Sequence, residues 1–315
     1  MLIEISLLIA GLVALVWGAE LLVDGSTKLA LGLGISTFVV GLTVVAFGTS
    51  APELFVSVNA ALKGSADVAI GNIIGSNTFN ILVVIGLAGF VNPFKVSRAV
   101  YSREMPIMIS VVGLFWYLSH DGVISRTSGI ILFFLLLVYI LMNAYIAKSK
   151  KLNIHDYAEE IEIKVVSKFK CIFLLVVGLA LMVIGSEFIV ANATILAREI
   201  GVSELVIGIT LVAVGTSLPE VATTFIAAKN GEPELAVGNA IGSNIFNVLC
   251  VIGITSAIQP LKVNPVSLTL DFPFMFFACA VALPLMLVRK QIRRIEGGLM
   301  LLAYFAYVFI LVKGI

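Results

Sequence analysis

The sequence predicts an all-α polytopic membrane protein: ten transmembrane helices in two inverted five-helix repeats, with helices 2 and 7 broken. Composition, a count of apolar segments and an internal repeat predict this fold. Of the 315 residues, 60% are hydrophobic and 12% are charged, and the mean hydropathy is +1.12. A soluble domain carries about 25% charged residues, so this apolar excess requires a lipid environment. The net charge of +1 gives no indication of a nucleic-acid partner.

Ten segments are apolar and long enough to cross the hydrocarbon core, which takes about 20 helical residues. Several exceed that length, which permits a tilt or a break. The fourth is short and contains Pro106. The first lacks a basic leader and a cleavage site, so we expect it to be a retained helix. The predicted spans are 2–22, 36–62, 67–91, 104–119, 127–147, 169–197, 203–228, 234–259, 267–288 and 296–313.

One extended polar stretch, residues 148–168, divides the chain into a first repeat, 1–147, and a second repeat, 169–315. With ten spans, alternate loops share a side of the membrane, and 15 of the Lys and Arg residues then fall on the side of this stretch against 5 on the other. Basic loops stay in the cytoplasm. We therefore expect a cytoplasmic 148–168 loop and two extracellular termini in the cell (inner) membrane.

The two halves repeat each other. Residues 18–87 align without a gap with residues 185–254, at a constant offset of 167, with 34 identities in 70 positions. Because each half has five spans, an odd number, the second must enter the membrane from the opposite side. Inverted repeats of this kind are typical of secondary transporters, which bind their substrate near mid-membrane at the repeat interface.

Polar residues interrupt the second span near its middle, at Thr49, Ser50, Pro52 and Glu53. The seventh span repeats them as Thr216, Ser217, Pro219 and Glu220. A carboxylate at the bilayer centre costs about 3 kcal/mol or more and marks a functional site. A purely structural kink, with hydroxyls bonded back to the helix, is the alternative, but it leaves the glutamate unexplained.

Each proline also changes the backbone around it. Pro52 has no N–H for the carbonyl of Gly48, so we expect carbonyls near Ala46 to Thr49 to lack helical partners. Pro219 has the same effect near Ala213 to Thr216. Freed backbone groups in a membrane need a neighbour or a bound cation. Carboxylate, hydroxyl and carbonyl oxygens together favour Na+ and Ca2+ over soft metals.

The third and eighth spans each carry a polar stripe at i, i+4 and i+8. These stripes are Asn72, Ser76 and Asn80, and Asn239, Ser243 and Asn247. We expect Ser76, Asn80, Ser243 and Asn247 to bind ions directly or to support the residues that do. For Asn72, Asn77, Asn239 and Asn244, ion binding and helix–helix contact both remain open.

Other polar residues give weaker signals. Glu20 and Glu187 match across the repeat but lie nearer the span ends, which favours a structural or gating role over ligation. Cys171, Cys250 and Cys279 lack metal-ligand spacing, and His120 and His155 lie in loops. No catalytic constellation is present, so the sequence predicts neither an enzyme nor a cofactor, only transported ions.

The motifs GTSAPE (48–53) and GNIIGSNTFN (71–80), with their partners GTSLPE (215–220) and GNAIGSNIFN (238–247), resemble the two α-repeats of the cation/Ca2+ exchanger superfamily, in particular its Na+/Ca2+ exchanger branch. The resemblance covers both repeats and the ten-span layout. It implies a secondary antiporter that exchanges Na+ for Ca2+ by alternating access. The short 148–168 loop fits a minimal prokaryotic-type form, and we expect a monomeric transport unit.

The resemblance also implies specific roles. Glu53 and Glu220 would share the Ca2+ site with the carbonyls of Thr49 and Thr216. One Na+ site would use the Ala46 carbonyl, Thr49, Ser50, Glu53 and Ser76, and its mirror would use the Ala213 carbonyl, Thr216, Ser217, Glu220 and Ser243. Asn80 and Asn247 would border a central position, where some members, including K+-dependent ones, have Asp in place of Asn247. An H+/Ca2+ antiporter of the same fold is the alternative, and a cation channel is a more distant one.

Overall fold

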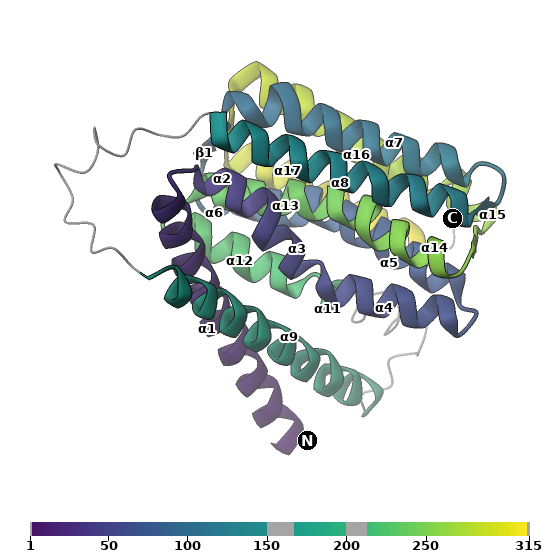
Figure 1. Cartoon of the computed structure of the whole chain (residues 1–315). Helices are drawn as coiled ribbons and strands as arrows, with labels where there is room; N and C mark the ends of the chain where they lie inside the picture. The colour runs from purple at the N-terminus through teal and green to yellow at the C-terminus, as the bar shows by residue number, and fades with distance from the viewer. Residues whose placement is uncertain (1, 150–166, 200–212, 314–315) are drawn as a thin grey trace.

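The computed structural model describes residues 2–149, 167–199 and 213–313, and these form a helical bundle (Figure 1). Eight of the described helical segments are long and apolar enough to cross a membrane. Many large apolar side chains lie exposed on the helices, such as Trp17, Phe55 and Leu141. An apolar exterior of this kind suits a lipid surrounding, so the prediction of a helical membrane protein is confirmed.

The first half contains α1 (Leu2–Leu33) and then a segmented second span. That span consists of α2 (Thr37–Val40), a π-helical turn (Gly41–Val45), α3 (Ala46–Thr49) and α4 (Ala51–Leu62). Next come α5 (Ala66–Phe79), a π-helical turn (Asn80–Ile85) and α6 (Gly86–Val91), followed by a π-helical turn (Val100–Glu104), α7 (Met105–Ser119) and α8 (Arg126–Ser149).

The second half begins with α9 (Lys168–Glu199), and its next described helices are α11 (Ala213–Thr216) and α12 (Leu218–Lys229). The chain continues with α13 (Pro233–Phe246), a π-helical turn (Asn247–Ile252) and α14 (Gly253–Ile258). It ends with α15 (Pro265–Thr269), α16 (Asp271–Arg289) and α17 (Arg294–Lys313).

Two boundaries differ from the sequence-based expectation. Helix α1 runs to Leu33 instead of residue 22, because the polar segment after it stays helical and carries an i,i+4 salt bridge between Lys28 and Asp24 of 2.7 Å. The fourth helical segment starts at Val100 instead of residue 104, with a π-helical turn. Much of the predicted seventh span, and most of the 148–168 loop, lies outside the described residues.

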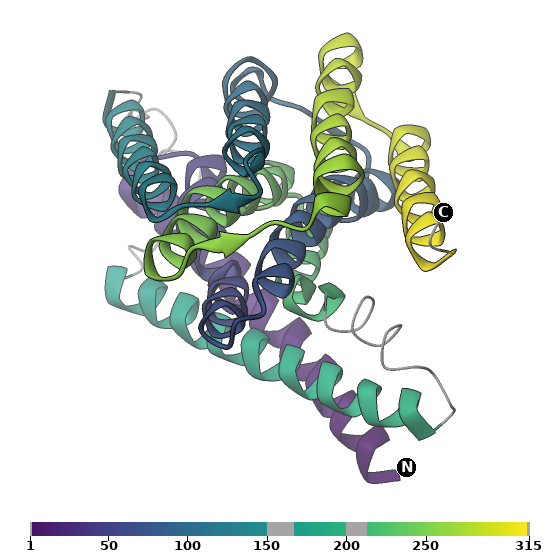
Figure 2. The same ribbon diagram turned by 90° about the vertical axis from the view of Figure 1, so that its right-hand side faces the viewer.

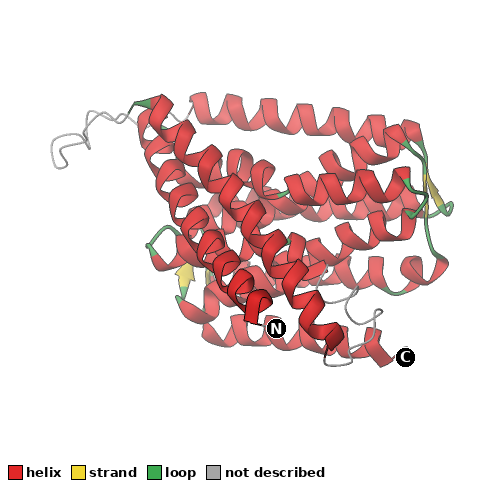
Figure 3. Ribbon diagram, turned by 90° about the horizontal axis from the view of Figure 1, so that it is seen from below, coloured by secondary structure: helices red, strands yellow, loops and turns green. Residues whose placement is uncertain are grey.

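Helices α1 and α9 cross each other beside the rest of the bundle (Figures 1 and 3). Glycines form the crossing: a Cβ on Gly11 would meet the Gly185 carbonyl oxygen at 2.8 Å, and one on Gly18 would meet that of Gly178 at 2.6 Å. Residue numbers rise along α1 as they fall along α9, so the two helices are antiparallel. They approach so closely because no side chain separates their backbones.

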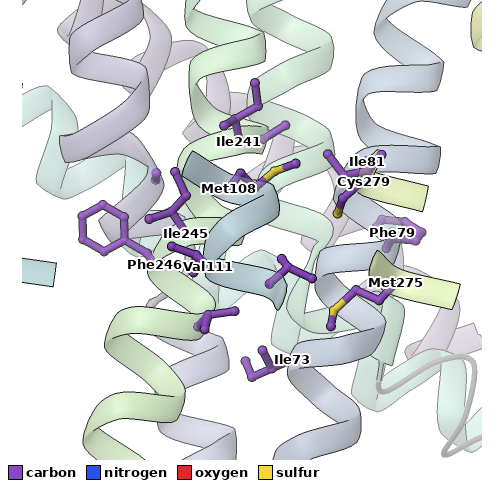
Figure 4. Close-up of a cluster of buried hydrophobic side chains, with 14 of the residues drawn as sticks. Ile73, Phe79, Ile81, Met108, Val111, Ile241, Ile245, Phe246, Met275 and Cys279 are labelled. Carbon is purple, nitrogen blue, oxygen red and sulfur yellow. The ribbon is translucent and has the colours of Figure 1, made fainter. Parts of the chain in front are cut away.

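The centre of the bundle consists of α5 and α13, whose residues are mostly buried. Helices α7 and α16 cover them on the side away from α1 and α9 (Figure 2). An apolar cluster joins these four helices and includes Ile73 of α5, Met108 of α7, Ile241 of α13 and Met275 of α16 (Figure 4). This packing fixes the two central helices, which also carry the polar stripes.

Two short antiparallel strand pairs connect the halves. Strand β1 (Phe94–Lys95) pairs with β4 (Gln291–Ile292), and β2 (Val123–Ile124) pairs with β3 (Leu261–Lys262). When 167 is added to its residue numbers, β1 coincides with β3 and β2 lies within one residue of β4. The two strand pairs are therefore equivalent under the repeat. In Figure 1 β1 lies at the left end of the bundle, and β3, between α14 and α15, lies at the right end.

Candidate cation site

Both helix breaks occur at the serine of the Thr-Ser-x-Pro motif. Ser50 separates α3 from α4 with φ −80° and ψ 1°, and Ser217 separates α11 from α12 with φ −93° and ψ 5°. Each proline then occupies the first turn of the following helix, where a missing N–H is tolerated. One non-helical residue is thus enough to interrupt the helix in each span.

The expected set of free carbonyls is partly wrong. The Ala46 carbonyl accepts the N–H of Ser50 at 3.0 Å, because a break of one residue preserves this bond. The Gly215 carbonyl, which Pro219 cannot serve, accepts a hydrogen bond from the hydroxyl of Ser186 on α9. A neighbouring helix therefore satisfies it. Ala213 is the first described residue of α11.

The two glutamates of the breaks are fully buried, and their carboxylates lie close enough for their charges to interact. Ser76 and Ser217 donate hydrogen bonds to Oε1 of Glu53, at 3.2 and 3.4 Å. Thr49 and Ser243 lie near Glu220 without reaching hydrogen-bond geometry. Within the described residues neither glutamate forms a salt bridge. Buried carboxylates without basic partners need either a bound cation or a proton to neutralise them.

Several buried oxygens at this centre have no hydrogen-bond partner among the described residues. They belong to Ser50 (Oγ), Glu53 (Oε2), Glu220 (both Oε), Asn80 (Oδ1) and Asn247 (Oδ1). An unsatisfied buried polar atom costs about 1–3 kcal/mol, so this set indicates a ligand. All are hard oxygen donors, as Na+ and Ca2+ prefer. Hydrogen bonds join Glu53, Ser76, Ser217 and Asn247 in one buried cluster, and Thr49 bonds to Ser243. These oxygens fit such cations.

Asn72 and Asn239 hold the two repeats together. Thr216 donates to Oδ1 of Asn72 at 3.2 Å, and Thr49 donates to Oδ1 of Asn239 at 3.1 Å. The Nδ2 of Asn72 donates to Ser57 at 3.0 Å, and that of Asn239 donates to Thr224 at 3.4 Å. These bonds favour helix–helix contact over ion binding for both asparagines. The predicted site did not include Ser57 and Thr224, although both are hydroxyl residues at equivalent positions of the repeat.

The remaining predicted residues fall into two groups. Ser76, Ser243, Asn80 and Asn247 are fully buried in the cluster, whereas Glu20 and Glu187 lie on exposed faces of α1 and α9. The three cysteines are buried and unpaired. His155 lies outside the described residues. Among the residues that the structure describes, no group of three His, Cys, Asp or Glu side chains could hold a metal, so the cluster depends on two carboxylates and neutral oxygens.

Comparison with known proteins identifies the family of this chain. The sodium/calcium exchanger protein family matches residues 3–145 and 170–313. The chain is 30% identical to the sodium/calcium exchanger MaX1 of Methanosarcina acetivorans over 97% of both chains. It is 36% identical to the putative antiporter CaxA of Alkalimonas amylolytica over 99% of both, and 37% identical to the inner membrane protein YrbG of Escherichia coli over 89% of this chain and 88% of YrbG.

Among solved structures, the chain resembles the sodium-calcium exchanger NCX_Mj soaked with Na+ and Sr2+. The TM-score is 0.84 with 29% sequence identity, and the alignment covers 98% of each chain. The family match spans both halves, the buried oxygen cluster lies between them, and the helices suit a membrane. The chain therefore belongs to the sodium/calcium exchanger protein family and is an integral membrane cation antiporter.

Proposed function

We propose that this antiporter exchanges Na+ for Ca2+ by alternating access, at a site formed by the two helix breaks and the two polar stripes. The observation that carries the proposal is the pair of buried carboxylates with unpartnered oxygens. The proposed ion ligands are Glu53, Glu220, Thr49, Thr216, Ser50, Ser217, Ser76, Ser243, Asn80, Asn247 and the carbonyls of Ala46 and Ala213. Relatives named as sodium/calcium exchangers support Na+ as the counter-ion.

Exchange follows from competition for two fixed negative charges. One Ca2+ or two or more Na+ can neutralise Glu53 and Glu220. Without cations, both carboxylates stand unpaired in a low-dielectric interior, which is costly. Because the loaded forms avoid this cost, they cross between inward-facing and outward-facing states more readily than the unloaded form does. Transport is then coupled, and leak is slow.

The proposed architecture has ten spans in two inverted repeats, 1–147 and 169–315. Equivalent contacts in the two halves support it: the Thr49–Asn239 and Thr216–Asn72 bonds and the two strand pairs correspond under the offset of 167. The antiparallel crossing of α1 and α9 fits a two-fold axis in the membrane plane. The excess of Lys and Arg supports a cytoplasmic 148–168 loop and extracellular termini. We also propose a monomeric transport unit in the cell membrane.

We assign the moving part to α1 and α9. The two helices approach each other closely at glycines and share an apolar cluster, so they can slide as a pair against the rest of the bundle. Contacts of α1 with α12 and of α9 with α11 and α12 connect this pair to the second helix break. Movement of the pair would therefore change access to the buried oxygens that the helix breaks and the polar stripes carry.

A gradient experiment tests the counter-ion. Purified protein in vesicles loaded with Na+ is diluted into Na+-free medium with Ca2+, in the presence of a protonophore, and Ca2+ uptake is followed. Na+/Ca2+ exchange requires uptake that depends on the Na+ gradient and survives the protonophore. Uptake driven only by a pH gradient would identify an H+/Ca2+ antiporter instead. Conductive Ca2+ flux without any ion on the opposite side would identify a channel.

A further inference from the structure

Asn77 and Asn244 form a reciprocal clasp between the two central helices. The Nδ2 of Asn77 donates to the Asn244 carbonyl at 3.4 Å, and the Nδ2 of Asn244 donates to the Asn77 carbonyl at 3.0 Å. Both side chains are fully buried. The offset of 167 relates the two residues, so the clasp is symmetric and joins α5 to α13 at the meeting point of the repeats.

A second bond breaks this symmetry. The Nδ2 of Asn247, a proposed ion ligand, donates to Oδ1 of Asn77 at 3.1 Å. The mirrored bond would run from Nδ2 of Asn80 to Oδ1 of Asn244. Both of those atoms are buried and have no partner within the described part of the chain. One half of the site has therefore closed a bond that the other half leaves open.

The surrounding hydroxyls follow the same pattern. Asn247 donates to Ser76 at 3.1 Å, and Ser217 donates to Ser76 at 3.0 Å. The mirrored bonds, from Asn80 and Ser50 to Ser243, are absent among the described residues, and the Ser50 hydroxyl has no partner. Three separate bonds are thus formed in one half only, whereas Ser243 shares a hydrogen bond of 3.2 Å with Thr49. The residues that form these bonds are identical between the repeats, so their own identities do not produce the difference.

We infer that Asn77 and Asn244 are positioning residues that alternate during transport: the Asn77–Asn247 bond belongs to one facing state and the Asn244–Asn80 bond to the opposite state. The inference rests on the proposed exchange function. Because the residues that form these bonds are the same in both halves, each half can form the bonds that the other half has formed. Exchanging the two conformations in an inverted repeat reverses the side of the membrane to which the site opens. In one state the side chain of Asn247 would be held by its bond to Asn77, and in the opposite state the side chain of Asn80 would be held by its bond to Asn244.

Two matched substitutions test this alternation. Asn77→Leu and Asn244→Leu keep the number of side-chain heavy atoms and the branch at Cγ, and each removes one of the two clasp bonds. They differ in the second bond, because Asn77→Leu removes it from the described state and Asn244→Leu removes it from the opposite one. A buried neutral hydrogen bond corresponds to about a fivefold change in an equilibrium. The two variants should therefore shift the equilibrium between facing states about fivefold in opposite directions.

The readout is the ratio of half-saturating Ca2+ concentrations at the two membrane faces, measured in right-side-out and inside-out vesicles. Apparent affinity scales with the population of the competent state, so this ratio reports the facing equilibrium. The variants should move the ratio in opposite directions from wild type, and the double variant should return it to within about twofold. Residues that serve folding alone would lower transport at both faces and leave the ratio unchanged.

Shifts in the same direction, or no shift in either variant, would overturn the alternation. If leucine prevents membrane insertion, the Asn77→Ser and Asn244→Ser pair provides the same comparison, and failure of both pairs to insert would show that the amides serve folding alone. Wild-type vesicles without any gradient-driven Ca2+ uptake would instead refute the proposed function. The two failures are therefore distinguishable.

Discussion

Replacing Glu220 by glutamine removes one of the two buried charges and almost none of the volume. The two oxygens of Glu220 have no described hydrogen-bond partner, so the substitution breaks no bond in the ion-free protein. A unit charge at about 4 Å in an effective dielectric near 20 contributes about 4 kcal/mol, and about twice that toward a divalent ion. Even if desolvation offsets half of the larger figure, Ca2+ affinity falls about 10³-fold.

Two assays separate binding from folding. Exchange measured in vesicles should be lost in Glu220→Gln at Ca2+ concentrations that saturate wild type. Thermal unfolding in chelator should occur at or above the wild-type temperature, because a costly buried charge is gone. Ca2+ at 100 times its dissociation constant stabilises wild type by about 2.7 kcal/mol, and this gain should vanish in the variant.

Glu20→Gln is the matched control for the same chemical change, since Glu20 lies on an exposed face of α1. It should retain both exchange and the stabilisation by Ca2+. Wild-type stabilisation by Ca2+ in Glu220→Gln would refute the assignment of this carboxylate to the cation site. Equal losses in the Glu20 and Glu220 variants would refute the argument from burial.

Three further substitutions test other parts of the structure. Gly18→Leu should stop exchange by forcing α1 away from α9, because a Cβ there meets backbone at 2.6 Å, whereas Gly32→Leu, which has open space around its Cβ, should leave uptake unchanged. Ser186→Ala should lower stability by about 1–3 kcal/mol in a thermal melt, because it leaves the buried carbonyl of Gly215 without its donor. Glu104→Gln should cost about 1–3 kcal/mol in the same assay, because the buried Glu104 carboxylate accepts hydrogen bonds from Tyr139 and from the partly buried Arg103, while gradient-driven uptake per folded protein stays near wild type.

The apolar spans and the residues at the two breaks could be predicted because membranes restrict the choices so strongly. A buried carboxylate beside Ser50 or Ser217 is costly in lipid, so its presence in the sequence already indicates a site. The offset of 167 then doubled the evidence. The assignment of these residues as ion ligands stays a prediction, as do the topology and the domain division.

Other features depend on tertiary contacts that no local pattern encodes. The π-helical turns at Asn80–Ile85 and Asn247–Ile252 begin at the last residue of each polar stripe, and helix periodicity alone does not reveal them. Ser186 has no polar equivalent in the first half, where Ala19 takes its place, so the repeat could not identify its role. The strand pairs are two residues long and join loops distant in sequence.

The contacts around the cluster explain why both repeats are needed for one site. Glu53 of the first repeat accepts a hydrogen bond from Ser217 of the second, and Thr49 is held by Asn239. Neither half can therefore orient its own ligands alone. Because these links cross between the repeats, a relative displacement of the halves alters every ligand at once. The same few hydrogen bonds therefore affect both the affinity for the ion and the access of the ion to the site. An ion that binds to the cluster stabilises the conformation that encloses the ion.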